Sequence, residues 1–154
     1  MMHIEKYKAV DVSFVELLAK KIAKVVKPPI VIALHGDLGV GKTAFAKFFI
    51  NTLLPDEVVS SPTFNIINRY NTCNFVIWHL DLYRIKDLDE LYDIGVEEVL
   101  NAGIAIVEWP ELIKKLTVPD IEININYNDD KNDLRDIIIQ TKSEKRRSYV
   151  TNIR

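Results

Sequence analysis

The central part of the chain joins an apolar run to a glycine-rich loop and reads Ile30-Val31-Ile32-Ala33-Leu34-His35-Gly36-Asp37-Leu38-Gly39-Val40-Gly41-Lys42-Thr43. The apolar run 30–34 predicts a strand buried on both faces, as in a parallel sheet. The loop 36–43 matches the pattern G-x-x-x-x-G-K-[ST] at every fixed position. Residues 42–54 read as a helix that stops before Pro55. A strand, a glycine-rich loop and a helix in this order predict a phosphate-binding loop.

Such a loop binds phosphate because several backbone N–H groups and the positive end of a helix point at one anion. Lys42 would reach the β and γ phosphates, and the Thr43 hydroxyl would ligate Mg²⁺. We therefore expect ATP or ADP to bind here together with Mg²⁺. The expected nucleotide-binding residues of the loop are Gly36, Asp37, Leu38, Gly39, Val40, Gly41, Lys42, Thr43 and Ala44.

Length and composition limit the class of protein. The chain has 154 residues, 48% hydrophobic and 27% charged, and predicts one domain over 1–141 followed by a basic tail over 142–154. A net charge of −2 gives no general attraction to DNA or to an anionic membrane. The single cysteine, Cys73, excludes an internal disulfide, and the charged residues 1–10 do not resemble a signal peptide. We expect a cytoplasmic protein.

The remaining sequence predicts further elements of an α/β domain. Amphipathic periodicity predicts a helix over 11–27, capped by Asp11 and stopped by two prolines. Other patterns predict a hairpin of 63–70 and 75–83, a helix over 87–100 interrupted near Gly95, and strands over 104–107, 121–127 and 134–141. We expect a three-layer domain with a mostly parallel central sheet, widened by the antiparallel hairpin and the C-terminal strands. The tail reads as a solvated, frayed end, or as a contact for RNA or an acidic partner through Lys145-Arg146-Arg147.

A phosphate-binding loop needs an acid at the end of a neighbouring strand to hold Mg²⁺ directly or through water. Glu108 follows the apolar strand 104–107, and Asp81 lies late in the hairpin strand 75–83, on the same face as His79. Each also has an ordinary interpretation. Glu108 could be a charge at the start of a helix, Asp81 a strand-end carboxylate, and His79 a hydrogen-bonded structural residue.

Other candidates surround this core. The segment Ser61-Pro62-Thr63-Phe64 is either a phosphate-sensing segment or a simple proline turn. Trp109 is either a packing residue or a platform for a base, and Arg69 and Arg84 are candidates for stabilising charge at the γ-phosphate. The chain lacks the Asn-Lys-x-Asp motif of guanine recognition, which disfavours a GTPase.

Four segments together resemble the TsaE (YjeE) ATPase family. They are residues 35–43, Ser61-Pro62-Thr63-Phe64, His79-Leu80-Asp81-Leu82-Tyr83-Arg84 and Val107-Glu108-Trp109-Pro110-Glu111, in this order. The resemblance extends from about residue 11 to residue 127. It implies an accessory ATPase for threonylcarbamoyladenosine modification of tRNAs that read codons beginning with A. It also implies docking on a complex of TsaD and TsaB, which the ATP cycle resets, so that tRNA is reached only through that complex.

The resemblance also implies roles for individual residues. Thr43 and Glu108 would be magnesium ligands, and Asp81 would support the metal and the attacking water. Lys42 would hold phosphate with the loop amides, so Lys42, Asp81 and Glu108 are the residues expected to take part in catalysis. Trp109 would lie near the nucleotide or the partner surface, and Thr63 would join the nucleotide-binding set.

Two other functions compete with an ATPase that is slow alone and activated by its partner. One is a free-standing small-molecule kinase, in which 61–64 and 81–84 would bind an acceptor hydroxyl. The other is a nucleotide-gated interaction module without meaningful turnover. The absence of a second substrate lobe favours hydrolysis over transfer to a metabolite.

Overall fold

A computed structural model describes residues 2–151 and 153, apart from the side chains of 144 and 145. Its strands are β1 (His3–Val10), β2 (Ile30–His35), β3 (Ile67–Asn71), β4 (Val76–Asp81), β5 (Ile104–Glu108), β6 (Ile121–Tyr127) and β7 (Arg135–Thr141). Its helices are α1 (Val12–Val25), α2 (Lys42–Leu53), α3 (Leu88–Asp93) and α4 (Val96–Asn101), with short 3₁₀ helices η1 (Ile113–Lys115) and η2 (Glu144–Tyr149).

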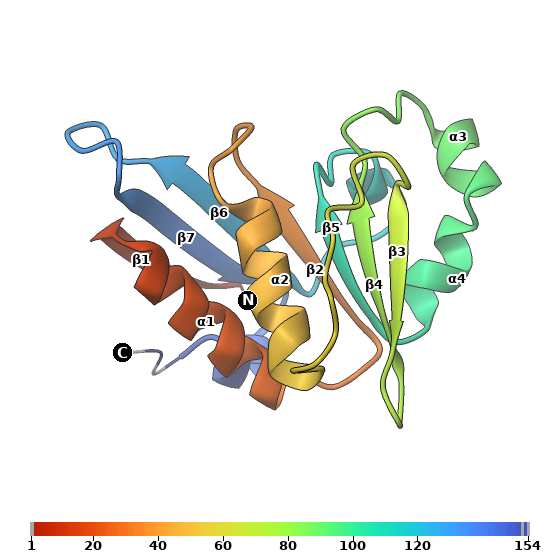
Figure 1. Ribbon diagram of the computed structural model, residues 1–154, viewed down its shortest axis with the longest axis horizontal. Coiled ribbons are helices and arrows are strands. Elements are labelled where there is room, and N and C mark those ends of the chain that lie inside the picture. The colour runs from red at the N-terminus through yellow and green to blue at the C-terminus, as the bar shows by residue number, and fades with distance from the viewer. Residues whose placement is uncertain (1, 152, 154) are drawn as a thin grey trace.

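The two most apolar strands, β2 and β5, are neighbours inside the sheet. Their side chains are apolar on both faces, and an interior position allows both faces to be covered. Within the described residues, seven strands form one sheet in the order β1-β7-β6-β2-β5-β4-β3 (Figure 1). Strands β6, β2, β5 and β4 run parallel to one another. The antiparallel pairs are β3 with β4, β6 with β7 and β7 with β1. The expected mostly parallel α/β sheet with antiparallel additions is therefore confirmed.

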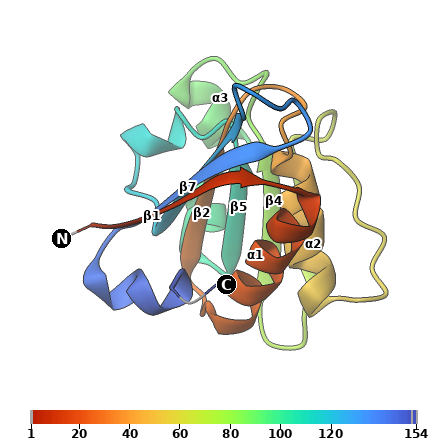
Figure 2. The same cartoon turned by 90° about the vertical axis from the view of Figure 1, so that its left-hand side faces the viewer.

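Side chains of the central strands alternate between two apolar cores. Ile30, Ile32 and Leu34 of β2 belong to a core, called the α1 core below, that also contains the buried faces of α1 and α2. Val31 belongs to a second core with residues of α3, α4 and η1. Figure 2 shows α1 and α2 together on one side of the sheet. Helical segments thus cover both faces of β2, as a parallel sheet requires.

Several predicted boundaries are confirmed. The Asp11 side chain accepts a hydrogen bond from the backbone N–H of Phe14 at 3.1 Å, which caps α1. Gly95 has φ of 79° and separates α3 from α4. The β3–β4 hairpin forms, although its first strand begins at Ile67 and residues 63–66 form turns. No helix within the described residues is long and apolar enough to cross a membrane.

The sequence patterns did not predict β1, which pairs with β7 at the end of the sheet. This strand lacks an apolar alternation, because Ile4 is 46% exposed while the polar His3 and Glu5 are partly buried.

The expectation of a solvated, frayed tail is wrong for the described residues after 142. There η2 forms, Val150 and Ile153 are buried in the α1 core, and Arg146 pairs with Asp120 at 3.3 Å. The side chain of Lys145 lies outside the described part.

A substitution at Val150 tests the packing of this tail. Val150 is 0% exposed, so Val150→Ala leaves a cavity and should lower the free energy of unfolding by about 1–3 kcal/mol. Urea denaturation measures the loss, and Ser148→Ala, at an exposed position of the same segment, is the matched control. Equal stabilities of the two variants would show that the tail does not pack in solution.

Candidate functional site

The parallel pairing of β2, β5 and β4 brings the predicted site residues together. Leu34 pairs with Glu108, and Asp81 pairs with Glu108 from the other side. These strands therefore end at the same edge of the sheet, where the glycine-rich loop 36–43 leaves β2 and enters α2 (Figure 1). Ligands of open α/β sheets bind in the crevice at this carboxyl edge.

Two glycines give the loop its path for different reasons. At Gly36 a Cβ atom would overlap the carbonyl oxygen of Ile125 and lie 2.7 Å from Cγ1 of Val40, so there is no room for a side chain. At Gly41, which precedes α2, a Cβ would meet nothing within 4 Å, but φ is 125°. A side chain there is excluded by backbone conformation instead of space.

Lys42 lies in the first turn of α2 and folds back over the loop. Its Nζ atom donates to the carbonyl oxygens of Gly36 and, at 3.3 Å, of Asp37. It also lies 3.6 Å from the ring centroid of Trp109. Burial lowers the pKa of Lys42, and the negative charges of Glu108 and Asp81 oppose that effect without cancelling it.

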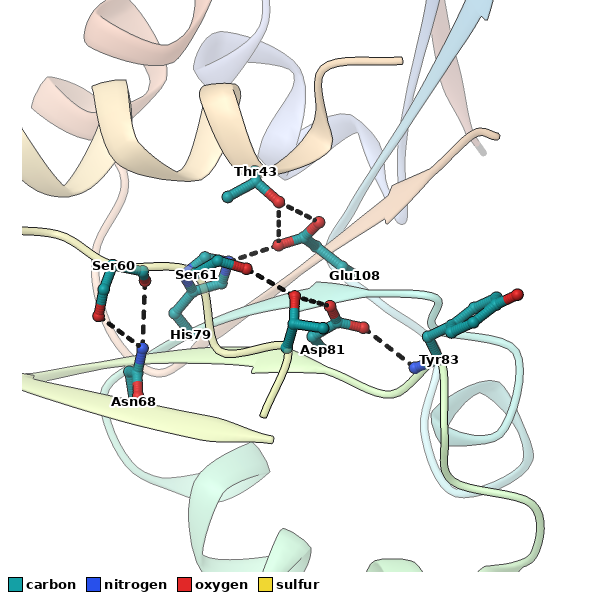
Figure 3. A network of polar contacts seen from close by, with 9 residues as sticks. Thr43, Ser60, Ser61, Asn68, His79, Asp81, Tyr83 and Glu108 are labelled. Carbon is teal, nitrogen blue, oxygen red and sulfur yellow. Dashed lines mark hydrogen bonds and ion pairs between the residues drawn. The ribbon is translucent and has the colours of Figure 1, made fainter. Parts of the chain in front are cut away.

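Glu108 is a buried carboxylate, with 2% of its surface exposed. It accepts from the Thr43 hydroxyl, with distances of 2.8 Å to Oε1 and 3.1 Å to Oε2. Its Oε2 atom also lies 2.7 Å from Nε2 of His79 (Figure 3). Side chains from α2 and β4 therefore converge on one carboxylate at the end of β5.

Asp81 connects the site to the segment before the hairpin. Its Oδ2 atom accepts from the Thr63 hydroxyl at 3.2 Å, and its Oδ1 atom accepts from the backbone N–H of Tyr83 at 3.1 Å. The Thr63 hydroxyl is in turn 2.7 Å from that of Ser61. The proline-containing segment 61–64 is thus hydrogen-bonded to a carboxylate of the site through Thr63. A simple proline turn exposed to solvent would have no such contact.

These groups surround a cavity of about 280 Å³. Its lining residues are Leu38, Gly39, Gly41, Lys42, Thr43, Ala44, Thr63, Asp81, Glu108 and Trp109, all of them predicted site residues. Three other predicted residues of the loop, Gly36, Asp37 and Val40, lie outside this lining. Val40 is buried in the α1 core, and Gly36 packs against β6 through Ile125.

Residues from β6 and β7 that the sequence analysis did not single out hold the loop from its other side. Tyr127 donates from its hydroxyl to the carbonyl oxygen of Leu38 at 3.2 Å, and Arg135 donates from Nε to that of Val40 at 2.8 Å. The Arg135 guanidinium also lies 4.4 Å from the Tyr127 ring centroid. No local motif marks this pair, because the contact depends on how β6 pairs with β2.

The two arginines considered for the γ-phosphate have other contacts. Arg84 lies over the ring of Phe64 at 4.9 Å, and Arg69 lies over Trp78 at 5.1 Å. Neither belongs to the described lining of the cavity. The structure therefore does not bring them to the site.

The oxygen donors of the cavity suit a hard cation. No group of three or more His, Cys, Asp and Glu side chains in the described residues is placed to hold a metal. The cavity does present the Thr43 hydroxyl and the Glu108 and Asp81 carboxylates. Mg²⁺ prefers oxygen ligands and usually binds through one or two carboxylates with phosphates and waters. The residues present therefore fit Mg²⁺ that arrives with a nucleotide.

The loop geometry predicts unequal costs for two alanine substitutions. Gly41→Ala should lower the free energy of unfolding by about 1–2 kcal/mol, because only the backbone conformation is strained. Gly36→Ala should cost about 2–5 kcal/mol, because overlap with Ile125 adds to that strain. Urea denaturation of both variants measures the difference. Losses of the same size would contradict the tight contact at Gly36.

Comparisons with known proteins show which family the chain resembles over most of its length. The family model described as "Threonylcarbamoyl adenosine biosynthesis protein TsaE" matches residues 10–137. The chain is 44% identical over 123 residues to the tRNA threonylcarbamoyladenosine biosynthesis protein TsaE of Rickettsia felis, covering 79% of this chain and 72% of the relative. It is 40% identical over 111 residues to the protein of that name from Bacillus subtilis, covering 71% and 69% of the two chains.

A solved structure is similar over nearly the whole chain. The crystal structure of Bacillus subtilis YdiB superposes with a TM-score of 0.73 at 29% identity, covering 99% of this chain and 95% of that one. The resemblance inferred from the four sequence segments is therefore confirmed, and the chain belongs to the TsaE family.

Proposed function

We propose that this protein is an accessory ATPase of tRNA threonylcarbamoyladenosine biosynthesis, which binds ATP with Mg²⁺ and hydrolyses it to ADP and phosphate. The names of the TsaE relatives support the pathway. One observation supports the chemistry: the Thr43 hydroxyl contacts the buried Glu108 carboxylate beside Lys42, where the glycine-rich loop enters α2. P-loop nucleotide hydrolases use a loop lysine, a Ser or Thr hydroxyl and a strand-end aspartate for phosphate and magnesium, and Glu108 supplies the carboxylate here.

Each group would contribute through its charge or its hydrogen bonds. Lys42 can exchange the loop carbonyls it now contacts for phosphate oxygens, while the loop amides bind the same anion. Thr43 and Glu108 would hold Mg²⁺, which neutralises charge that develops on the phosphates. Asp81, whose carboxylate is oriented by Thr63 and the Tyr83 N–H, would support the metal and orient the attacking water.

We infer that turnover is slow in the isolated protein. The described lining of the cavity contains neither an arginine nor a glutamine, the residues that stabilise transition-state charge or orient water in related switches. A partner would complete the site. On the family resemblance this partner is the TsaD–TsaB complex in the cytoplasm, with tRNA reached through that complex and with no role for DNA or a membrane.

ATP hydrolysis by the purified protein, alone and with TsaD and TsaB, tests this proposal. We expect stimulation by the partners, and we expect Lys42→Ala and Glu108→Ala each to reduce the stimulated rate on the order of 100-fold or more, because each removes charge stabilisation at the phosphates. Lys47→Ala, on the same helix and outside the cavity lining, is the matched control. Parental rates in Lys42→Ala would refute the assignment of the site.

Product analysis separates hydrolysis from phosphoryl transfer to a metabolite. The cavity of about 280 Å³ is slightly smaller than the usual small-ligand pocket of about 300–1,000 Å³, so a bound nucleotide leaves little room for a second substrate, which favours water as the acceptor. With ATP labelled at the γ-phosphate, all released label should be inorganic phosphate. Label on a small molecule from a metabolite extract would support the kinase alternative. Nucleotide-dependent binding of TsaD and TsaB without phosphate release would support an interaction module.

A further inference from the structure

His79 has an unusual environment for a buried histidine. It is 0% exposed, and its Nε2 atom contacts Glu108 at 2.7 Å. Its Nδ1 atom is the one buried side-chain nitrogen or oxygen in the described residues without a hydrogen-bond partner. Buried polar atoms nearly always have a hydrogen-bond partner. A fully buried imidazole with one unpaired nitrogen therefore destabilises the fold relative to an apolar side chain of the same size, which indicates that His79 does more than fill space.

The hydrogen bond to Glu108 assigns the roles of the two nitrogens. An ionised carboxylate only accepts hydrogen bonds, so Nε2 of His79 carries a proton and donates it. Among the described residues, no lysine or arginine nitrogen lies within ion-pair distance of the Glu108 carboxylate. Of the side chains described, His79 is the one nitrogen-containing side chain at that distance. Its other hydrogen bond comes from the neutral Thr43 hydroxyl.

The sheet register explains why position 79 can reach this carboxylate. In the parallel pair of β4 and β5, His79 is opposite Ile106 and Asp81 is opposite Glu108. His79 is therefore diagonal to Glu108 on the same face, within reach of a long side chain. Trp78 and Leu80, on the other face, belong to the second apolar core. Figure 3 shows His79 and Glu108 meeting from neighbouring strands below Thr43.

We propose that His79 is a positioning residue that fixes the Glu108 carboxylate beside Thr43 and so prepares the magnesium site; this inference rests on the proposed function. A glutamate has three side-chain torsions, and burial alone does not choose among its rotamers. The Nε2–H donor of His79 holds Oε2, and Thr43 contacts both oxygens. Partners of metal-binding carboxylates that act in this way typically contribute 10- to 100-fold to metal affinity.

Two amide substitutions separate this role from simple packing. In His79→Gln the amide NH₂ lies near the place of Nε2 and keeps the donor to Glu108. In His79→Asn the shorter side chain places its NH₂ near the place of Nδ1, where it cannot reach. Both variants are polar and uncharged, so they differ in the donor to Glu108 and in one methylene group, whose loss lowers the free energy of unfolding but not the dependence of nucleotide binding on Mg²⁺. His79→Leu, of comparable size and without a donor, replaces the asparagine variant if that variant does not fold.

The readout is the affinity for fluorescently labelled ADP in Mg²⁺ and in EDTA, with thermal unfolding as a check on the fold. We expect the parental protein and His79→Gln to bind more tightly in Mg²⁺ than in EDTA. His79→Asn should weaken the binding in Mg²⁺ by about 10- to 100-fold and leave the binding in EDTA close to the parental value. In a Glu108→Gln background, His79→Asn should cause little further change, because His79 acts through Glu108.

The possible failures are distinguishable. A parental protein that binds no nucleotide, or binds it equally in Mg²⁺ and EDTA, would overturn the proposed function and with it this inference. A parental protein that depends on Mg²⁺, combined with an asparagine variant that has the same dependence, would overturn the role of His79 alone. An equal loss in the glutamine and asparagine variants would also overturn it, since that pattern indicates packing.

Discussion

The buried carboxylate of Glu108 is the group around which the site is organised. Burying an ionised carboxylate is costly unless hydrogen bonds replace its lost hydration. Glu108 obtains them from Thr43 at the start of α2 and from His79 on β4. These contacts require α2, β4 and β5 to meet in one register. Any shift of β4 against β5 by a single residue would turn His79 to the opposite face of the sheet.

The parallel order of the strands meets this requirement and gives the site its other components. Because β2, β5 and β4 end at one edge, the glycine-rich loop, Glu108 and Asp81 face a common cavity. The antiparallel additions support that edge from both sides. On one side the segment before β3 brings Thr63 to Asp81. On the other, Tyr127 and Arg135 of β6 and β7 bind the loop backbone.

The parts of the fold that follow from local patterns could be predicted from the sequence. The apolar runs of β2 and β5, the Asp11 cap and the glycine-rich loop carry their signals in neighbouring residues. Strand β1 could not be predicted in this way, because its pairing with β7 gives polar residues the partly buried positions. The burial of Val150 also depends on distant packing. In the site, the cavity residues were predictable by motif, whereas the His79–Glu108 contact depends on the register of two strands.

A crystal structure of the protein with ADP and Mg²⁺ tests the central claim most directly. The account predicts that the phosphates lie within the glycine-rich loop beside Lys42. It also predicts that the metal lies against Thr43 and Glu108, with the Glu108 carboxylate still bonded to His79. Nucleotide bound at another place, or a metal that does not contact either Thr43 or Glu108, would contradict the account.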